Sequence, residues 1–151
     1  MTSKRKMSSS DKRVWQWLNF ISRPNKKLNG NAICPWITTY MDKLMVVNSK
    51  QPEVVVENFV TFKDVFHLEA IVIHGFRMGY DKQYDWIDRW NKKYKKKDVY
   101  VLGMRPDSEE PPLPLKYNFE KPLIIVQKLS TLKRARQETA KNSDYYKHYN
   151  K

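Results

Sequence analysis

Ala70-Ile71-Val72-Ile73-His74-Gly75 is a nearly continuous run of apolar residues that ends at a glycine. Such a run is typical of a central β-strand that is covered on both faces, whereas a strand with one wet face alternates apolar and polar residues. Further short apolar runs at 44–47, 99–102 and 123–126 predict three more strands. The sequence therefore predicts a sheet built around residues 70–74.

Patterns with helical spacing lie between these runs. The first has Val14, Trp17, Leu18 and Ile21 on one face and should end near Arg23, because Pro24 follows it. Further helices are expected over 35–43, 79–97 and 130–140. Residues 54–66 also have helical spacing, and we choose a helix there, although the valines at its start favour a strand. This alternation predicts an α/β fold: one domain with a mixed sheet of about four strands and helices packed on it.

The two ends of the chain are polar and basic. We expect a flexible basic arm over 1–10, a single domain over 11–140 and a flexible tail over 141–151. No apolar run approaches the ~20 residues that a membrane helix needs, so we expect no membrane partner. A lone cysteine cannot form an internal disulfide, which favours a cytoplasmic location.

The formal net charge is +13 at pH 7, a value that favours encounters with polyanions. Nucleic acid is the commonest polyanion, and tyrosines beside lysines would supply rings for base stacking. The charge could equally serve solubility alone, and no recognised nucleic-acid-binding motif is present. The candidate nucleic-acid-binding residues are Lys92, Lys93, Lys95, Lys96, Lys97 and Arg134.

Cys34 is the first candidate for chemistry, because it precedes Pro35 at the start of an expected helix. A thiol at a helix N-terminus has a lowered pKa and is a better nucleophile as thiolate. His74 ends the central strand, at the edge where α/β sheets bind ligands. We therefore take Cys34 and His74 as the candidate catalytic pair. The alternative is a small buried cysteine and a core histidine that bonds to the backbone.

Two arginines follow strand ends and could hold a carboxylate or phosphate. They are Arg77 and Arg105; Asp107 beside Arg105 and Asn31 before Cys34 complete the candidate ligand-binding set. The alternative is that both arginines point into solvent. The histidines and Cys34 lack the short spacing of metal ligands, and no phosphate-binding glycine loop is present, so we expect no metal and no cofactor.

The order of motifs resembles an uncharacterised bacterial domain family. Asn31-Ala32-Ile33-Cys34-Pro35-Trp36 is similar to its Leu-Asn-Leu-Cys-Pro-Phe-Ala signature, and Ile73-His74-Gly75 is similar to its Ile-His-Pro. Gly103-Met104-Arg105-Pro106-Asp107 is similar to its Ser-Phe-His-Pro-Asp-Tyr, with Arg105 in place of histidine, and 122–126 is similar to its last strand. The resemblance runs from about Trp15 to Arg136 and implies the location of a site rather than a reaction.

Three functions remain open from the sequence. The leading hypothesis is a small-ligand or thiol-based site at Cys34, whether enzymatic or not, that takes a small anionic ligand. The second is a nucleic-acid-binding accessory protein without catalysis. The third is a structural or partner-binding protein that acts through the proline-rich connection at 105–121 and its tails.

Overall fold

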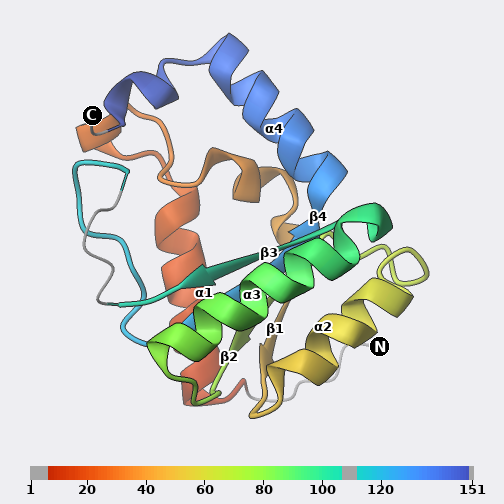
Figure 1. The fold of residues 1–151 in the computed structure, drawn as a ribbon. Helices are drawn as coiled ribbons and strands as arrows, with labels where there is room; N and C mark the ends of the chain where they lie inside the picture. Colours follow the sequence, from red (N-terminus) through yellow and green to blue (C-terminus); the bar gives the residue numbers. More distant parts are fainter. Residues whose placement is uncertain (1–6, 107–111, 150–151) are drawn as a thin grey trace.

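The computed structural model describes residues 7–106 and 112–149 as one α/β domain with a four-stranded mixed sheet, which confirms the predicted fold class. The strand order is β1-β2-β4-β3 (Figure 1). β1 (Leu44–Asn48) and β2 (Ala70–His74) are parallel, whereas β4 (Leu123–Lys128) is antiparallel to both β2 and β3 (Val99–Met104). All five residues of β2 are buried, as its apolar sequence predicts.

Helices cover both faces of the sheet (Figure 1). α2 (Pro52–Phe62) and α3 (Tyr80–Tyr94) pack on one face, where α2 buries Val56 and Phe59. α1 (Ser9–Ser22) packs on the other face, and α4 (Leu129–Asn142), which follows β4 directly, contacts β4 and the segment at 35–39. Within residues 7–106 and 112–149 the short 3-10 helices are η1 (Lys26–Leu28), η2 (Pro35–Thr39), η3 (Met41–Lys43), η4 (Lys95–Lys97) and η5 (Tyr145–His148), of which η5 follows α4.

α1 forms where its sequence predicts. The Ser8 hydroxyl accepts a hydrogen bond from the Asp11 backbone N–H at 3.1 Å, which satisfies a free donor in the first turn. The four residues of its apolar face, Val14, Trp17, Leu18 and Ile21, are all buried. The choice of a helix over a strand for 54–66 is also confirmed, since α2 occupies most of that range.

The segment 35–43 differs from its prediction, because it forms η2 and η3 rather than one α-helix. The hydroxyls of Thr38 and Thr39 donate to the carbonyls of Pro35 and Trp36 at 2.6 and 2.7 Å. Each bond spans three residues, and these contacts accompany the tighter 3-10 turn. Cys34 therefore does not precede an α-helix.

The C-terminal segment also differs from the prediction of a tail from residue 141. α4 continues to Asn142, and Tyr145 in η5 is only 2% exposed in the core beside α1. Its hydroxyl donates to the Ile33 carbonyl. Residues 141–149 thus form part of the domain. The segment is rich in polar residues, but its aromatic rings supply enough apolar surface to pack against the core. Most of the predicted arm, residues 1–6, lies outside the described residues.

Gly75 makes the turn that leaves β2. Its φ is +83°, a conformation that other residues rarely adopt, and a Cβ there would collide with the Asn48 side chain. Proline is fixed near −65° and cannot replace it. The turn after His74 is therefore unlike an Ile-His-Pro turn.

Candidate functional site

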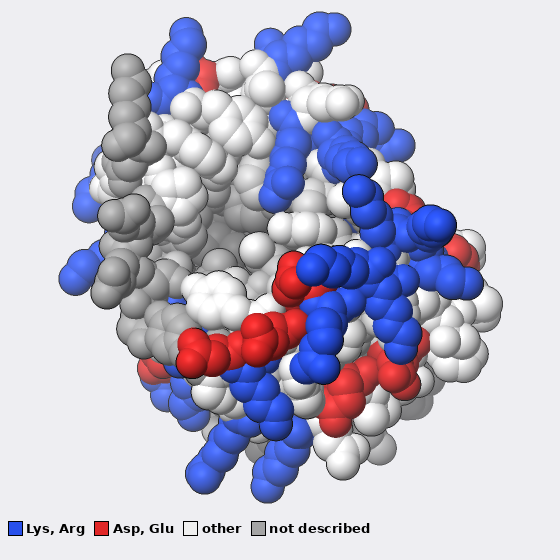
Figure 2. Space-filling view, viewed as in Figure 1, with Lys and Arg blue, Asp and Glu red and all other residues white. Residues whose placement is uncertain are grey.

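A cavity of about 560 Å³ lies on the sheet face that carries α1 and α4. Its wall comes from α1, η2, β3, β4, α4, η5 and the segment after residue 111. Figure 2 shows the hollow from outside, with uncharged atoms around it. The aromatic lining residues are Trp17, Trp36, Tyr40, Tyr117, Tyr145, Tyr146 and Tyr149. The other side chains used below are Cys34, Leu102, Met104, Asn118, Gln127 and Arg136.

Hydrogen bonds and ring contacts hold the aromatic wall. The Trp17 indole N–H donates to the Tyr117 carbonyl at 2.6 Å, which ties α1 to the segment that follows residue 111. Tyr145 meets Trp36 and Tyr149 edge-on, with ring centroids 5.8 and 5.6 Å apart. The cavity is thus bounded by rings whose positions are fixed by neighbouring elements.

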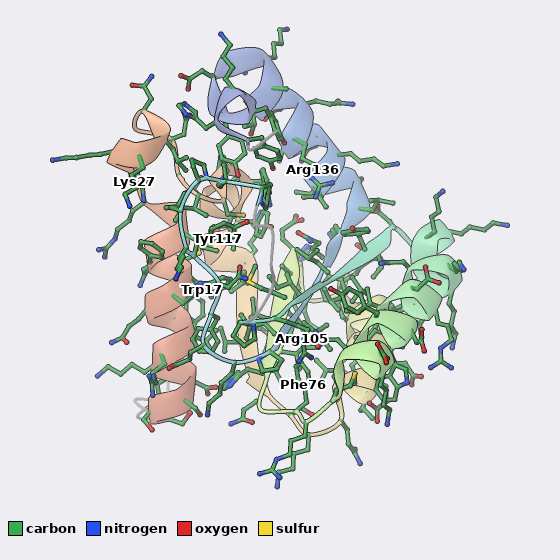
Figure 3. All side chains as sticks on the ribbon, turned by 60° about the vertical axis from the view of Figure 1, so that its left-hand side comes forward. Trp17, Lys27, Phe76, Arg105, Tyr117 and Arg136 are labelled. Carbon is green, nitrogen blue, oxygen red and sulfur yellow. The ribbon has the colours of Figure 1, made fainter. Side chains whose placement is uncertain are left out.

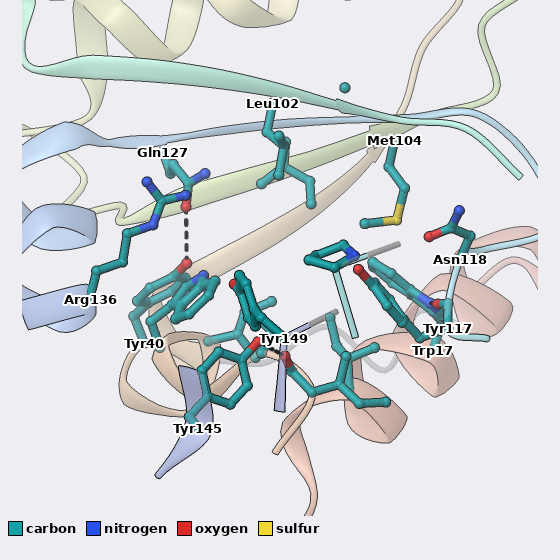
Figure 4. A pocket seen from close by; sticks show the side chains of 18 of the residues that line it. Trp17, Tyr40, Leu102, Met104, Tyr117, Asn118, Gln127, Arg136, Tyr145 and Tyr149 are labelled. Carbon is teal, nitrogen blue, oxygen red and sulfur yellow. Dashed lines mark hydrogen bonds between the residues drawn. The ribbon is translucent and has the colours of Figure 1, made fainter. Parts of the chain in front are cut away.

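Tyr40, Gln127 and Arg136 lie together at one end of the cavity. Tyr40 donates from its hydroxyl to the Gln127 side-chain oxygen at 3.2 Å. Figure 4 shows the Arg136 side chain extending from α4 toward Gln127 and Tyr40, with Trp17, Tyr117 and Asn118 at the other end. Arg136 lies 5.6 Å from the Trp36 ring centre and makes no ion pair among residues 7–106 and 112–149. This end of the cavity is positively charged.

Four tyrosines of the wall, Tyr40, Tyr117, Tyr145 and Tyr146, remain protonated at neutral pH. Burial raises the pKa of Tyr117 to about 12, and it also raises the pKa of Tyr40, Tyr145 and Tyr146. Desolvation is the main cause for all four, because it disfavours the phenolate. The rings therefore act as neutral walls with hydroxyl groups.

Cys34 lines the same cavity, but its pKa is raised rather than lowered, so the side chain is a thiol and not the predicted thiolate. Burial raises the pKa of Cys34 to about 12, while a backbone hydrogen bond at Ile37 and the charge of Arg136 lower it by less. The prediction of a lowered pKa is therefore wrong. It rested on an α-helix that does not form, and desolvation dominates where the helix dipole is missing.

His74 lies apart from Cys34. Its Nε2 is 2.5 Å from Asp11 Oδ1 in the first turn of α1, whereas the Cys34 backbone N–H donates to the Ile21 carbonyl at the end of that helix. Those contact points on α1 are ten residues, and so about 15 Å, apart. The two predicted catalytic residues share a sheet face but occupy opposite ends of it, and His74 does not line the cavity.

The predicted anion ligands also lie at separate places. Arg105 donates to the side-chain oxygen of Gln83, on α3, at 3.0 Å and lines a smaller cavity there, apart from Trp17 and Arg136 (Figure 3). Arg77 lines an open hollow with Lys50 and Lys121. Asn31 donates to Asp144 at 2.5 Å. Asp107 lies outside the described residues.

The predicted nucleic-acid-binding residues are all exposed. Lys92 pairs with Asp88 at 2.9 Å, and Lys93 lies 5.2 Å from the ring centre of Tyr94. Lys95, Lys96 and Lys97 form η4, and Arg134 lies on α4. Figure 2 shows Lys and Arg side chains gathered beside the hollow, on the side of the molecule where α4 and η4 lie.

In the part of the chain that is described, no group of three or more His, Cys, Asp or Glu could hold a metal ion. Within the same residues, no helix is both long and apolar enough to cross a membrane. No family model matches the chain, and no match to a curated protein or a solved structure was found. The resemblance to a bacterial family therefore stays a prediction.

Sequence reasoning placed Cys34 at a site but missed most of the residues around it. The aromatic count was the available signal, since five tryptophans and nine tyrosines are many for this length. Their grouping was not visible, because Trp17, Tyr117 and Tyr145 belong to segments about 100 and 30 residues apart. Arg136 likewise looked like one more solvated cation of a basic helix.

Proposed function

We propose that the protein binds a small planar ligand in the aromatic cavity, with an anionic or hydrogen-bond-accepting group of that ligand at Arg136. The observation that carries the proposal is the arrangement of tyrosine and tryptophan rings around one guanidinium that has no ion-pair partner among the described residues. Cavities that hold small molecules are mostly apolar, with a few polar groups that fix the orientation of the ligand.

The size and the wall of the cavity indicate the shape of the ligand. A volume of about 560 Å³ falls within the range of roughly 300–1,000 Å³ in which drug-sized molecules bind. Leu102 and Met104 contribute apolar atoms from β3, opposite the rings of Tyr145 and Tyr149. A flat apolar body between them would gain both buried area and ring contacts.

The polar end selects the functional group of the ligand. Gln127 accepts from Tyr40 through its side-chain oxygen, which leaves its amide N–H groups as donors. Arg136 adds further donors and a positive charge, and no acidic residue is among the described residues that line the cavity. A carboxylate, sulfonate or carbonyl oxygen meets these donors without a competing negative charge.

Cys34 contributes packing to this site rather than a nucleophile. A thiol with a pKa of about 12 is almost entirely protonated at pH 7, and the thiolate is the reactive form. No histidine lines the cavity among the residues described. The proposal is therefore binding without thiol catalysis.

The test uses 2-naphthoate as the probe and its neutral analogue 2-naphthamide as the comparison, both titrated into the full chain by calorimetry. We expect naphthoate to bind and Arg136→Gln to weaken it by about tenfold or more, because a hydrogen bond to a charged group is lost. The affinity for naphthamide should change much less.

Arg134→Gln is the matched control, since Arg134 is exposed on the same helix and does not line the cavity. Leu102→Trp should narrow the cavity and weaken binding of both probes while Arg136 remains. Equal naphthoate affinities in Arg136→Gln and Arg134→Gln, or naphthoate binding that is unchanged by Leu102→Trp, would contradict the proposal.

Polyanion binding is the second candidate, and one contact favours it. Asp98, directly after η4, accepts from the backbone N–H and the hydroxyl of Ser130 at 2.7 and 2.6 Å. These two hydrogen bonds join the segment that carries the lysines of η4 to the first turn of α4. Lys133 and Arg134 lie further along the same helix. Two basic segments thereby form one continuous surface that could track a phosphate backbone.

A further inference from the structure

A second cavity, of about 340 Å³, lies on the opposite face of the sheet. It is lined by Glu53 from α2 and by Trp86, Arg89, Trp90 and Lys93 from α3. These two helices run side by side across that face (Figure 1). The cavity shares no lining residue with the aromatic cavity proposed above.

The carboxylate of Glu53 supplies the first observation. Its Oε2 is buried and has no hydrogen-bond partner among residues 7–106 and 112–149. A buried carboxylate oxygen without a donor is destabilising, so such atoms are normally paired. The residue before it is proline, which has no backbone N–H to offer. The Glu53 carboxylate therefore has one oxygen without a donor, in a side chain that lines the cavity.

Two tryptophans supply the second observation. Trp86 and Trp90 are half-buried one helical turn apart, with ring centroids 5.4 Å apart and planes inclined by 59°. Inclined indole faces attract ammonium groups through their π-electrons. Lys82, which is outside the cavity lining, already places its ammonium 4.9 Å from the centre of the Trp86 ring. These rings are thus positioned to contact a cation.

Two cations supply the third observation. Arg89 and Lys93 lie on the same side of α3 as the tryptophans and line the cavity with Glu53. Arg89 donates from Nε to the Asp85 backbone carbonyl at 3.4 Å, and neither side chain forms an ion pair within the described part of the chain. The cavity therefore presents a negative group and two positive groups to one small volume.

We infer that this cavity binds a small zwitterion that carries a protonated primary amine and, a few bonds away, a carboxylate or phosphate. The ammonium donates to Glu53 and lies against Trp86 and Trp90, while the anionic group meets Arg89 and Lys93. A quaternary ammonium fits the rings but has no N–H for Glu53, so the site distinguishes the two. The same chemistry occurs in amino acids and in phosphoethanolamine.

The test titrates the full chain by calorimetry with phosphoethanolamine, glycine and phosphocholine. We expect at least one of the two primary amines to bind, and phosphocholine to bind about tenfold more weakly than phosphoethanolamine, because it cannot donate to Glu53. Binding of phosphoethanolamine alone identifies a phosphate subsite, and binding of glycine alone identifies a carboxylate subsite.

Two variants separate the roles of the charges. Glu53→Gln should weaken the bound amine by about tenfold or more, whereas Glu57→Gln, an exposed glutamate one turn further along α2, should not. Arg89→Gln should weaken phosphoethanolamine or glycine but leave ethylamine unchanged. Because Arg89 is exposed, this variant is expected to fold, and thermal unfolding checks both variants.

The inference is overturned if neither primary amine binds, if phosphocholine equals phosphoethanolamine, or if Glu53→Gln behaves like Glu57→Gln. Naphthoate should not compete with the zwitterion, because the two cavities lie on opposite faces of the sheet. Failure of one proposal is therefore distinguishable from failure of the other.

Discussion

The thiol of Cys34 faces aromatic rings, and this environment decides its chemistry. Desolvation is the largest influence on its pKa and outweighs both the backbone hydrogen bond at Ile37 and the positive charge of Arg136. A cation at the mouth of a cavity is screened by water, whereas the loss of water around the half-buried sulfur acts directly on the thiolate. The side chain behaves as a small apolar residue with a weak donor.

Alkylation by iodoacetamide tests this environment. We expect Cys34 to react far more slowly than free cysteine at pH 8, since its pKa is raised to about 12. A plot of the rate against pH should show no inflection below pH 9, the ordinary pKa of the thiol. Unfolding in guanidinium chloride should restore the rate of free cysteine. A folded-state rate equal to that of free cysteine would show that the thiol is not desolvated.

At this scale the sequence predicted the position of Cys34 but not its surroundings. The turn before Pro35 placed it correctly at the start of a short helix. Its pKa depends mainly on desolvation, and the residues that line the cavity with it, such as Tyr145 and Tyr117, are brought there only by tertiary structure. The pairing of His74 with Asp11 was equally invisible, because it depends on how α1 lies across β2.

Among the elements, η5 is held by a side-chain clamp. Asp144 accepts from Asn29 and Asn31 at 3.0 and 2.5 Å, and His148 adds a further contact. The hydrogen bonds from Asn29 and then Asn31 are the largest causes that hold the pKa of Asp144 below its usual value. The clamp fastens the C-terminal segment to the turn before Cys34 and thereby closes one wall of the aromatic cavity.

Acid should release this clamp. Because the folded-state pKa of Asp144 is lowered, its contribution to stability is present above the unfolded-state value of 3.8 and is lost as the pH falls through the folded-state value. Asp144→Asn should lower the melting temperature at pH 7 and reduce the loss of stability on acidification below pH 3.8. Thermal unfolding measured from pH 7 to pH 2.5 checks both effects, with Asp85→Asn as an exposed control.

Identical acid sensitivity in Asp144→Asn and Asp85→Asn would contradict the clamp. Amide hydrogen exchange gives a second readout, since release of η5 should raise exchange at Lys147 and Tyr149, whose N–H groups bond within that segment.

Strands and long helices were predictable at the scale of elements, whereas short turns were not. Uninterrupted apolar runs predict the buried strands, and four apolar residues on one helical face predict α1. In 35–43 the helical pattern was overridden by bonds from the threonine hydroxyls to carbonyls three residues earlier. Likewise, α4 begins at Leu129, and the Ser130 hydroxyl in its first turn donates to Asp98.

At the scale of the whole molecule, a group of Lys and Arg side chains lies beside the hollow on the face that Figure 2 shows. The three lysines of η4 are exposed, and Asp98 links their segment to α4. Acidic side chains lie among the basic ones on this face, and ion pairs join Asp88 to Lys92 and Asp64 to both Lys128 and Lys63. Under the polyanion-binding proposal, this positive charge steers polyanions toward the side of the molecule that holds the cavity.

Salt dependence tests polyanion binding. We expect the logarithm of the affinity for a labelled single-stranded oligonucleotide to fall linearly with the logarithm of the salt concentration, by about 0.7 per phosphate contact. Lys95→Gln with Lys96→Gln should reduce the slope by about 1.4. The double change Lys26→Gln and Lys27→Gln, in η1 on the far side of α1 from η4, is the control (Figure 3).

The assay is run at a salt concentration of about 50 mM, where the Debye length of about 14 Å leaves charges weakly screened. If the oligonucleotide does not bind under this condition, the polyanion-binding proposal is wrong. An equal slope for the two double variants would show that η4 makes no special contribution.

The mixed sheet was predictable as a class, but its strand order was not. Apolar runs identify strands without identifying their neighbours, and nothing in the run at 123–126 shows that it inserts between β2 and β3. The register that matches Met104 with Leu123 requires the proline-containing connection to return to the same end of the sheet. This return brings Tyr117 and Asn118 to the cavity.

The central position of β4 governs when the sheet can assemble. β2 and β3 have no hydrogen bonds to each other, and each is paired with β4, the last strand in the chain. During synthesis, β3 must therefore wait without a partner until residues 123–128 have left the ribosome, with its apolar edge open to other chains. A nascent chain that stalls before Leu123 should need a chaperone, and one that passes Lys128 should complete its sheet in a single late step.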